Sequence, residues 1–284
     1  MRKAATAGDH LSVERVDEHE WRFHYPRLDR GVHEEFHEAL ELMDAGEYGA
    51  VIPRLRKLIK RFPEFIDARH HLALALTESD PTFEYVANAE WRSAVEIGSA
   101  VLPPEFVIGR DRLQWGWLDN RPYLRACGGL ALSAMKEGQT GEALAIWQDM
   151  LDFNPNDNQG IRSLAVNGLF ARRRPIDALA LCDRYPDDGM PDLLYGRVLA
   201  LLMLDRKDEA VAALEKGANL TPLVAKELLK KTHHAPRGLY PDYITVGGAD
   251  EAYYYWRDAG EFWKRTPGAL AFVRETLSKK EIGE

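Results

Sequence analysis

From Val32 onward, apolar residues recur at the spacing of amphipathic helices. The first helical face consists of residues three or four positions apart: Phe36, Ala39, Leu40 and Met43. Gly46 ends this segment, and a second helical segment runs from about 48 to 62, where Pro63 follows. Proline lacks the backbone donor that a helix needs and clashes with the preceding turn. The pattern predicts two helices joined by a short turn.

The same helix pair recurs further along the chain. Four equivalent positions lie 92 residues later: Gly138 after Gly46, Ala143 after Val51, Trp147 after Leu55 and Pro155 after Pro63. Another copy, with Ala210, Leu214 and Pro222, lies 67 residues after the second one, which is about two periods of a ~34-residue repeat. The copy between them, at 158–185, fits with one inserted residue. The spacing predicts a stack of similar helix pairs, three of them well defined and two degenerate.

In the best-defined copy the pattern is Leu130-Ala131, Gly138, Ala143, Trp147 and Pro155. It resembles the tetratricopeptide repeat, in which a small residue lets two antiparallel helices approach and a bulky one fills the adjoining space. The resemblance covers roughly residues 32–225. It implies an all-α fold, a right-handed superhelical solenoid of antiparallel helix pairs. It also implies a protein-protein interaction scaffold that binds a partner on its concave face and is not an enzyme.

Three segments depart from the repeat pattern. Residues 1–30 lack helical periodicity and are expected to form a loose tail, able to fold back onto the body. Within the repeats, expected at 31–231, the connection at 103–121 is too long for an ordinary turn, so it is either functional or contains short structure of its own. Residues 232–284 are expected to form a helical cap, because the last repeat would otherwise expose an apolar face. The alternative for 253–256 is an exposed aromatic binding platform.

The register of the family implies which residues line the concave groove: Arg125, Gln159, Arg162, Asp192 and Tyr195. Arginine presents forked donors to carboxylates, and tyrosine offers contact area with a polar tip. An acidic segment or a free carboxylate is therefore the expected partner. The long connection offers a second candidate surface, with Arg112, Trp115, Trp117 and Arg121.

The segment from His33 to His37 gives an alternative function, because it fits a zinc metalloprotease motif. Two histidines four residues apart could share a metal while Glu34 activates a water molecule. However, in one class of zinc metalloproteases the motif continues with a glycine and a histidine, and this chain has Leu40 and Met43 at those positions. In another class the third zinc ligand stands where this chain has Arg56. No catalytic residue, metal ligand or cofactor is therefore expected. The register still leaves open a four-histidine group that binds a metal or senses pH: His33, His37, His70 and His71.

Charge and composition narrow the function further. The chain has 37 Lys and Arg against 45 Asp and Glu, a net charge of −8, which disfavours nucleic-acid binding, an RNA-binding solenoid included. Two cysteines are too few for a disulfide scaffold and suit a reducing compartment. No apolar run approaches the ~20 residues of a membrane span, and no signal peptide is recognisable. The expected location is cytoplasmic, while the partner's identity and the oligomeric state stay open.

Overall fold

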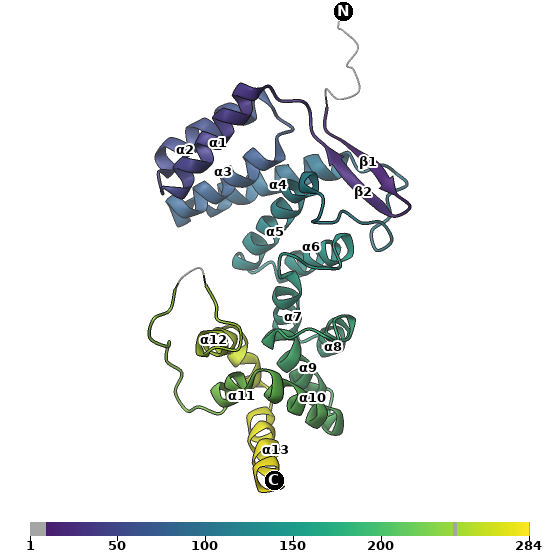
Figure 1. Cartoon of the computed structure of the whole chain (residues 1–284), viewed down its shortest axis with the longest axis vertical. Coiled ribbons are helices and arrows are strands. Elements are labelled where there is room, and N and C mark those ends of the chain that lie inside the picture. Colours follow the sequence, from purple (N-terminus) through teal and green to yellow (C-terminus); the bar gives the residue numbers. More distant parts are fainter. Residues whose placement is uncertain (1–9, 241–242, 284) are drawn as a thin grey trace, which may run out of the picture. The chain divides into compact units, whose positions relative to one another are not determined.

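The computed structural model describes residues 10–240 and 243–283, most of which are helical (Figure 1). The chain divides into two compact units, Met1–Ile161 and Arg162–Glu284, and each is described by itself. The expected fold class is confirmed, since helices follow one another in pairs and the described residues form strands only in one hairpin. Within the same residues, no helix combines the length and the apolar character that crossing a membrane requires.

Three helix pairs make up most of the first unit. They are α1 (Arg30–Asp44) with α2 (Tyr48–Arg61), α3 (Ile66–Ser79) with α4 (Glu84–Ala100), and α5 (Arg121–Lys136) with α6 (Thr140–Phe153). The side chain of Asp29 begins α1 by accepting a hydrogen bond from the Val32 amide, 2.9 Å away. Helix α5 crosses α4 where Trp91 meets Gly129, and a Cβ atom on that glycine would lie only 2.3 Å from the indole ring. The small residue is therefore what allows these two helices to pack.

Four of the turns inside the helix pairs share one backbone feature. Gly46 and Gly138, which the repeat spacing had paired, both have positive φ angles, of 75° and 77°. In the second unit the equivalent turns hold Arg173 and Asp205, with φ angles of 53° and 56°. Each of these four residues lies between the two helices of a pair and has a left-handed backbone conformation, which glycine adopts most easily.

The second unit contains the remaining helices. They are α7 (Ile161–Ala171), α8 (Pro175–Arg184), α9 (Pro191–Met203), α10 (Lys207–Leu220), α11 (Pro222–Leu228), α12 (Ala249–Arg265) and α13 (Ala269–Gly283). Helix α12 packs against α9 and α11. Its Trp263 is fully buried and donates a hydrogen bond to the Tyr255 hydroxyl, 2.7 Å away. The Tyr255 ring in turn lies 5.6 Å from that of Tyr195 on α9.

The aromatic residues of α12 do not form an exposed platform. Tyr255, within the segment of that alternative, is only 5% exposed. Trp256 is buried as well, and Tyr253 and Tyr254 are half-buried. These contacts support a structural role for α12 at the end of the repeats.

The N-terminal region differs from the loose tail that was expected. Strands β1 (Ser12–Asp17) and β2 (Glu20–His24) form an antiparallel hairpin, with Ser12 opposite His24. Trp21 and Phe23 alternate with more exposed neighbours and are buried, so the hairpin has one apolar face. This alternation was too short to stand out against the polar residues before it. Residues 1–9 of the expected tail lie outside the described residues.

The long connection at 103–121 contains short structure of its own and holds the hairpin in place. The buried Asn120 accepts a hydrogen bond from the Phe23 amide and donates one to the Trp21 carbonyl, both 3.0 Å long. The Trp21 amide also donates to the Arg112 carbonyl, 2.9 Å away. In the middle of the connection, the guanidinium of Arg110 donates to the buried carboxylate of Asp111 and lowers its pKa. Hairpin and connection therefore form one ordered addition to the repeats.

Candidate functional site

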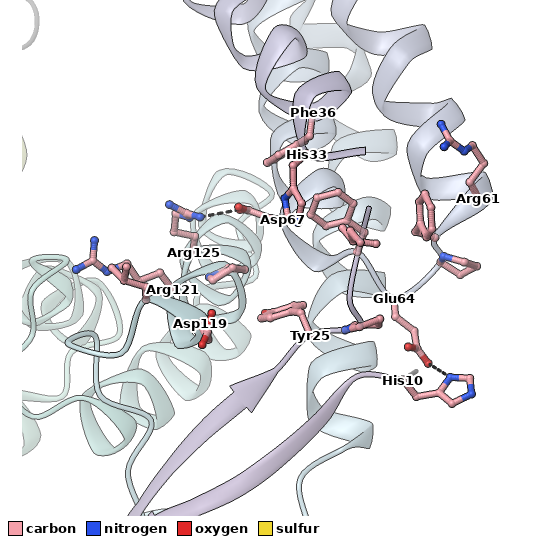
Figure 2. Close-up of a pocket in the computed structure, with 17 residues that line it drawn as sticks. His10, Tyr25, His33, Phe36, Arg61, Glu64, Asp67, Asp119, Arg121 and Arg125 are labelled. Carbon is pink, nitrogen blue, oxygen red and sulfur yellow. Dashed lines mark hydrogen bonds and ion pairs between the residues drawn. The ribbon is translucent and has the colours of Figure 1, made fainter. Parts of the chain in front are cut away.

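A cavity of about 710 Å³ lies in the first unit, where the hairpin meets the helices (Figure 2). Its walls come from the connection between β2 and α1, from the start of α1, from the turn between α2 and α3, and from the segment that leads into α5. Elements far apart in the sequence thus meet around one space. The volume falls within the range of ordinary small-ligand pockets.

Most of the lining is apolar, and much of it is aromatic. The apolar and aromatic lining residues are Tyr25, Pro26, Leu28, Phe36, Phe62, Pro63, Phe65, Leu118 and Pro122. Phe36 of α1 and Phe65 before α3 form a tilted pair with ring centroids 4.8 Å apart. Leu118 is 67% exposed although it lines the cavity. The pocket therefore presents apolar surface that no other side chain among the described residues covers.

The charged side chains of the lining balance one another. Three arginines (Arg61, Arg121, Arg125) face three carboxylates (Glu64, Asp67, Asp119). The guanidinium of Arg125 donates to Asp67 Oδ1, 2.7 Å away, and Arg61 pairs with Glu35 outside the lining. Arg121 donates to the Trp115 carbonyl and lies over that residue's ring, and it pairs with no carboxylate among the described residues. Arg121 is thus the lining arginine whose charge is not matched by a direct ion pair.

Two polar atoms in the wall of the pocket have no hydrogen-bond partner among the described residues. They are the hydroxyl of Tyr25 and Nε of Arg125, and both are shielded from solvent. The Tyr25 ring projects toward Asp119 (Figure 2). Burial raises the pKa of this hydroxyl well above its ordinary value; the charges of Asp67 and Asp119 raise it further, and that of Arg125 lowers it. The hydroxyl therefore lies within electrostatic reach of all three charged groups.

The predicted groove residues divide between the two units. In the first unit, Arg125 lines the pocket, whereas Gln159 does not and donates a long, 3.5 Å hydrogen bond to the Leu124 carbonyl. In the second unit, Arg162 forms an ion pair with Asp188 and lies over the Tyr185 ring.

The other two predicted groove residues lie in the second unit, where Asp192 is half-buried and Tyr195 is buried. Asp192 accepts a hydrogen bond of 2.9 Å from Asn167, and burial raises its pKa to about 6. The assignment of Tyr195 to a binding surface was wrong, because this residue is fully buried and its hydroxyl donates to the Thr221 carbonyl, 2.9 Å away. Tyr195 is a core residue that α12 covers.

Of the four candidates in the long connection, only Arg121 lines the pocket. Trp115 is half-buried beneath the Arg121 guanidinium, and Trp117 is half-buried beneath that of Arg22. The side chain of Arg112 is exposed, while its backbone is joined to the hairpin. The connection thus positions the pocket wall and presents no separate row of exposed aromatic rings.

The four histidines do not come together as a metal site. His33 lines the pocket, His37 is exposed beside Glu41, His70 is buried, and the His71 ring donates to the Asp67 backbone carbonyl. No group of three or more histidine, cysteine or acidic side chains in residues 10–240 and 243–283 has an arrangement that could hold a metal ion. The zinc alternative therefore has no support from the geometry.

Sequence reasoning missed most of the pocket. Tyr25, Phe36, Phe65 and Asp67 had no assigned binding role, because they lie outside the groove register of the repeats. The one available signal was the cluster of aromatic residues at 21–26, which has no place in a helical repeat.

Comparisons with known proteins agree with the architecture. No model of a known protein family matches the sequence, and no curated protein sequence matches it either. Among solved structures, YrrB, described as a TPR protein with an unusual peptide-binding site, is 14% identical with a TM-score of 0.50, covering 66% of this chain and 85% of its own. A tetratricopeptide repeat protein from Parabacteroides merdae is 11% identical with a TM-score of 0.54, covering 88% and 79%. MamA is 12% identical with a TM-score of 0.51, covering 72% and 98%. At these identities the likeness concerns the fold, and the chain has the fold of a tetratricopeptide-repeat protein.

Proposed function

We propose that the protein is an interaction scaffold that binds a segment of a partner protein in the pocket of the first unit. One observation carries this proposal: an open cavity of about 710 Å³, walled by aromatic rings, lies where the hairpin meets the repeats. Pockets of this kind typically accept an anchoring side chain of a partner. A similar fold is described as having a peptide-binding site in YrrB, which supports the same use here.

The partner's charge is a separate part of the proposal. Arginines in the groove predicted an acidic segment or a free carboxylate. Asp67 already accepts a hydrogen bond from Arg125, so this preference now depends on Arg121, which pairs with no carboxylate among the described residues. We assign to Arg121 the contact with an acidic group that flanks the anchoring residue. Such a contact would weaken as salt rises.

The test is to select binders for the intact chain from random 12-residue peptides and to measure their affinities for two variants. Leu118→Glu replaces an exposed apolar residue of the pocket with a charge, and it should weaken the selected peptides about tenfold or more. Ile176→Glu is the matched control, because Ile176 is 70% exposed and does not line the pocket. If the peptides bind both variants as tightly as the unchanged chain, the pocket is not where the partner binds.

A further inference from the structure

The two unsatisfied polar atoms indicate what the pocket binds. Buried hydrogen-bonding groups in folded proteins nearly always have a partner, so two orphaned donors in one pocket wall call for an explanation. Arg125 Nε can only donate, and the Tyr25 hydroxyl can donate or accept. An oxygen atom of a bound group can accept from both donors, and the two residues are close enough for the charge of Arg125 to lower the pKa of Tyr25.

The charges of the lining restrict the group that carries this oxygen. A carboxylate would meet Asp67 and Asp119, whose charges already act on the Tyr25 hydroxyl. A neutral hydroxyl group avoids that repulsion, because it accepts from the two donors and gives its own proton to a carboxylate. Asp67 already matches the charge of Arg125, so an anionic group beside that arginine would gain little.

The apolar wall defines the rest of the occupant. The rings of Phe36 and Phe65 are tilted against each other, and proline side chains also line the cavity. An aromatic ring gains about 0.5–1.5 kcal/mol from such neighbours beyond the burial of its area. An aromatic ring that carries a neutral hydroxyl group matches both the wall and the orphaned donors.

We propose that the pocket takes a tyrosine side chain from the partner segment. Its ring packs beside Phe36 and Phe65, and its phenol oxygen accepts hydrogen bonds from the Tyr25 hydroxyl and Arg125 Nε. The inference rests on the proposed function and specifies the anchoring residue of the partner, while the acidic group that meets Arg121 lies beside that anchor.

Entry of the tyrosine requires a small movement of the wall. Both donors are shielded from solvent, so the phenol reaches them only when the Tyr25 side chain shifts. That shift breaks no hydrogen bond of the Tyr25 hydroxyl, because this group has none among the described residues. The new hydrogen bonds therefore add to the free energy of binding without the loss of an existing hydrogen bond of this group.

The test compares N-acetyl-L-tyrosine amide with N-acetyl-L-phenylalanine amide, which differ by one hydroxyl group, in NMR titrations of the intact chain. The tyrosine probe should bind about two- to tenfold more tightly, which is about the net contribution of one typical hydrogen bond. Tyr25→Phe should reduce this preference to less than twofold. Arg125→Lys keeps a cation beside Asp67 but removes Nε, and it should reduce the preference in the same way.

Two controls separate the possible outcomes. Tyr85→Phe removes the hydroxyl of a tyrosine that is 81% exposed and outside the pocket, so the preference should persist. Leu118→Glu should weaken both probes. Equal binding of the two probes, no binding of either, or a preference that survives in both Tyr25→Phe and Arg125→Lys would overturn the tyrosine inference. Loss of the selected 12-residue peptides in Leu118→Glu would still support the pocket in those cases, so the two proposals can fail separately.

Discussion

The indole Nε1 of Trp91 donates a hydrogen bond to Nδ1 of His70, 3.1 Å away, in the core of the first unit. Because Nδ1 accepts, it carries no proton, and His70 is neutral. Burial is the main reason that the pKa of His70 falls from 6.5 to about 3, and the charges of His71 and Arg125 lower it further. The core of the first unit therefore contains a histidine that resists protonation.

The first prediction is that mild acid destabilises the first unit. In the unfolded chain His70 binds a proton below about pH 6.5, whereas in the folded chain it does so only near pH 3. Its contribution to stability is therefore complete above pH 6.5 and is lost as the pH falls toward 3. Between pH 7 and pH 5 the free energy of unfolding should fall by about 2 kcal/mol through this residue. Denaturant titrations at the two pH values measure the effect.

The variant for this test is His70→Gln, which can still accept from Trp91 but does not titrate. This substitution should remove most of the decrease in the free energy of unfolding between pH 7 and pH 5. His33→Gln, at an exposed histidine, is the matched control and should retain the loss. An unchanged pH dependence in His70→Gln would show that other groups cause the acid sensitivity.

The second prediction concerns Asp192 and has the opposite sign. Burial raises the pKa of its carboxyl from 3.8 to about 6, so the folded state holds a proton that the unfolded state has released. Stability therefore falls as the pH rises from about 4 to 6 and stays at the lower level above that. Asp192→Asn keeps an acceptor for Asn167 and removes the charge, so it should stabilise the protein at pH 7 by about 1–3 kcal/mol and by much less at pH 4.

Thermal melts at both pH values decide the Asp192 prediction. Asp187→Asn, at an exposed position nearby in the sequence, should leave the melting temperature nearly unchanged at either pH. A stabilisation by Asp192→Asn that is equally large at pH 4 would mean that removing the charge is not its cause.

The third prediction is that Tyr25→Phe stabilises the free protein while it weakens tyrosine recognition. A shielded hydroxyl without a partner costs free energy in the folded state. Its removal should raise the free energy of unfolding by about 1 kcal/mol, measured by denaturant titration without any ligand. Destabilisation by Tyr25→Phe would indicate that the hydroxyl has a hydrogen-bond partner in solution.

The fourth prediction tests whether the C-terminal region is a structural cap. Trp263 is fully buried in α12, and Trp263→Ala should cost about 3–5 kcal/mol. Tyr254→Ala, at a half-buried position on the same helix, should cost clearly less. Deletion of 235–284 should lower the melting temperature sharply and promote aggregation, because it uncovers the aromatic contact at Tyr195. A truncated chain that is equally stable but no longer binds its partner would show that the region binds and does not cap.

The helix pairs could be predicted because each one contains its own local signals. Gly46 and Gly138 stand in equivalent turns, and Trp147 follows Ala143 at the spacing that close helix packing requires. Such signals depend on neighbours within one repeat, and a single sequence displays them. The hairpin was missed because its alternating pattern covers only five residues in β2.

The pocket could not be predicted in the same way. Tyr25 and Arg125 lie 100 positions apart, and only the docking of the hairpin against Asn120 brings them to one cavity. Tyr195 was assigned to a surface for a related reason. Its hydroxyl bonds to the Thr221 carbonyl at the end of α10, and its ring lies beside Tyr255 of α12. Repeat spacing does not include a helix such as α12, which arrives so much later in the chain.

The left-handed turns at Arg173 and Asp205 bear on how the chain can change over evolutionary time. A side chain in this conformation is strained by roughly 1–2 kcal/mol. Substitution by glycine relieves the strain, but part of this stabilisation is offset because glycine makes the unfolded chain more flexible. Arg173→Gly and Asp205→Gly should each stabilise the second unit by about 0.5–1 kcal/mol. One substitution at either turn could therefore compensate for a destabilising change elsewhere in that unit, which widens the range of sequences compatible with the fold.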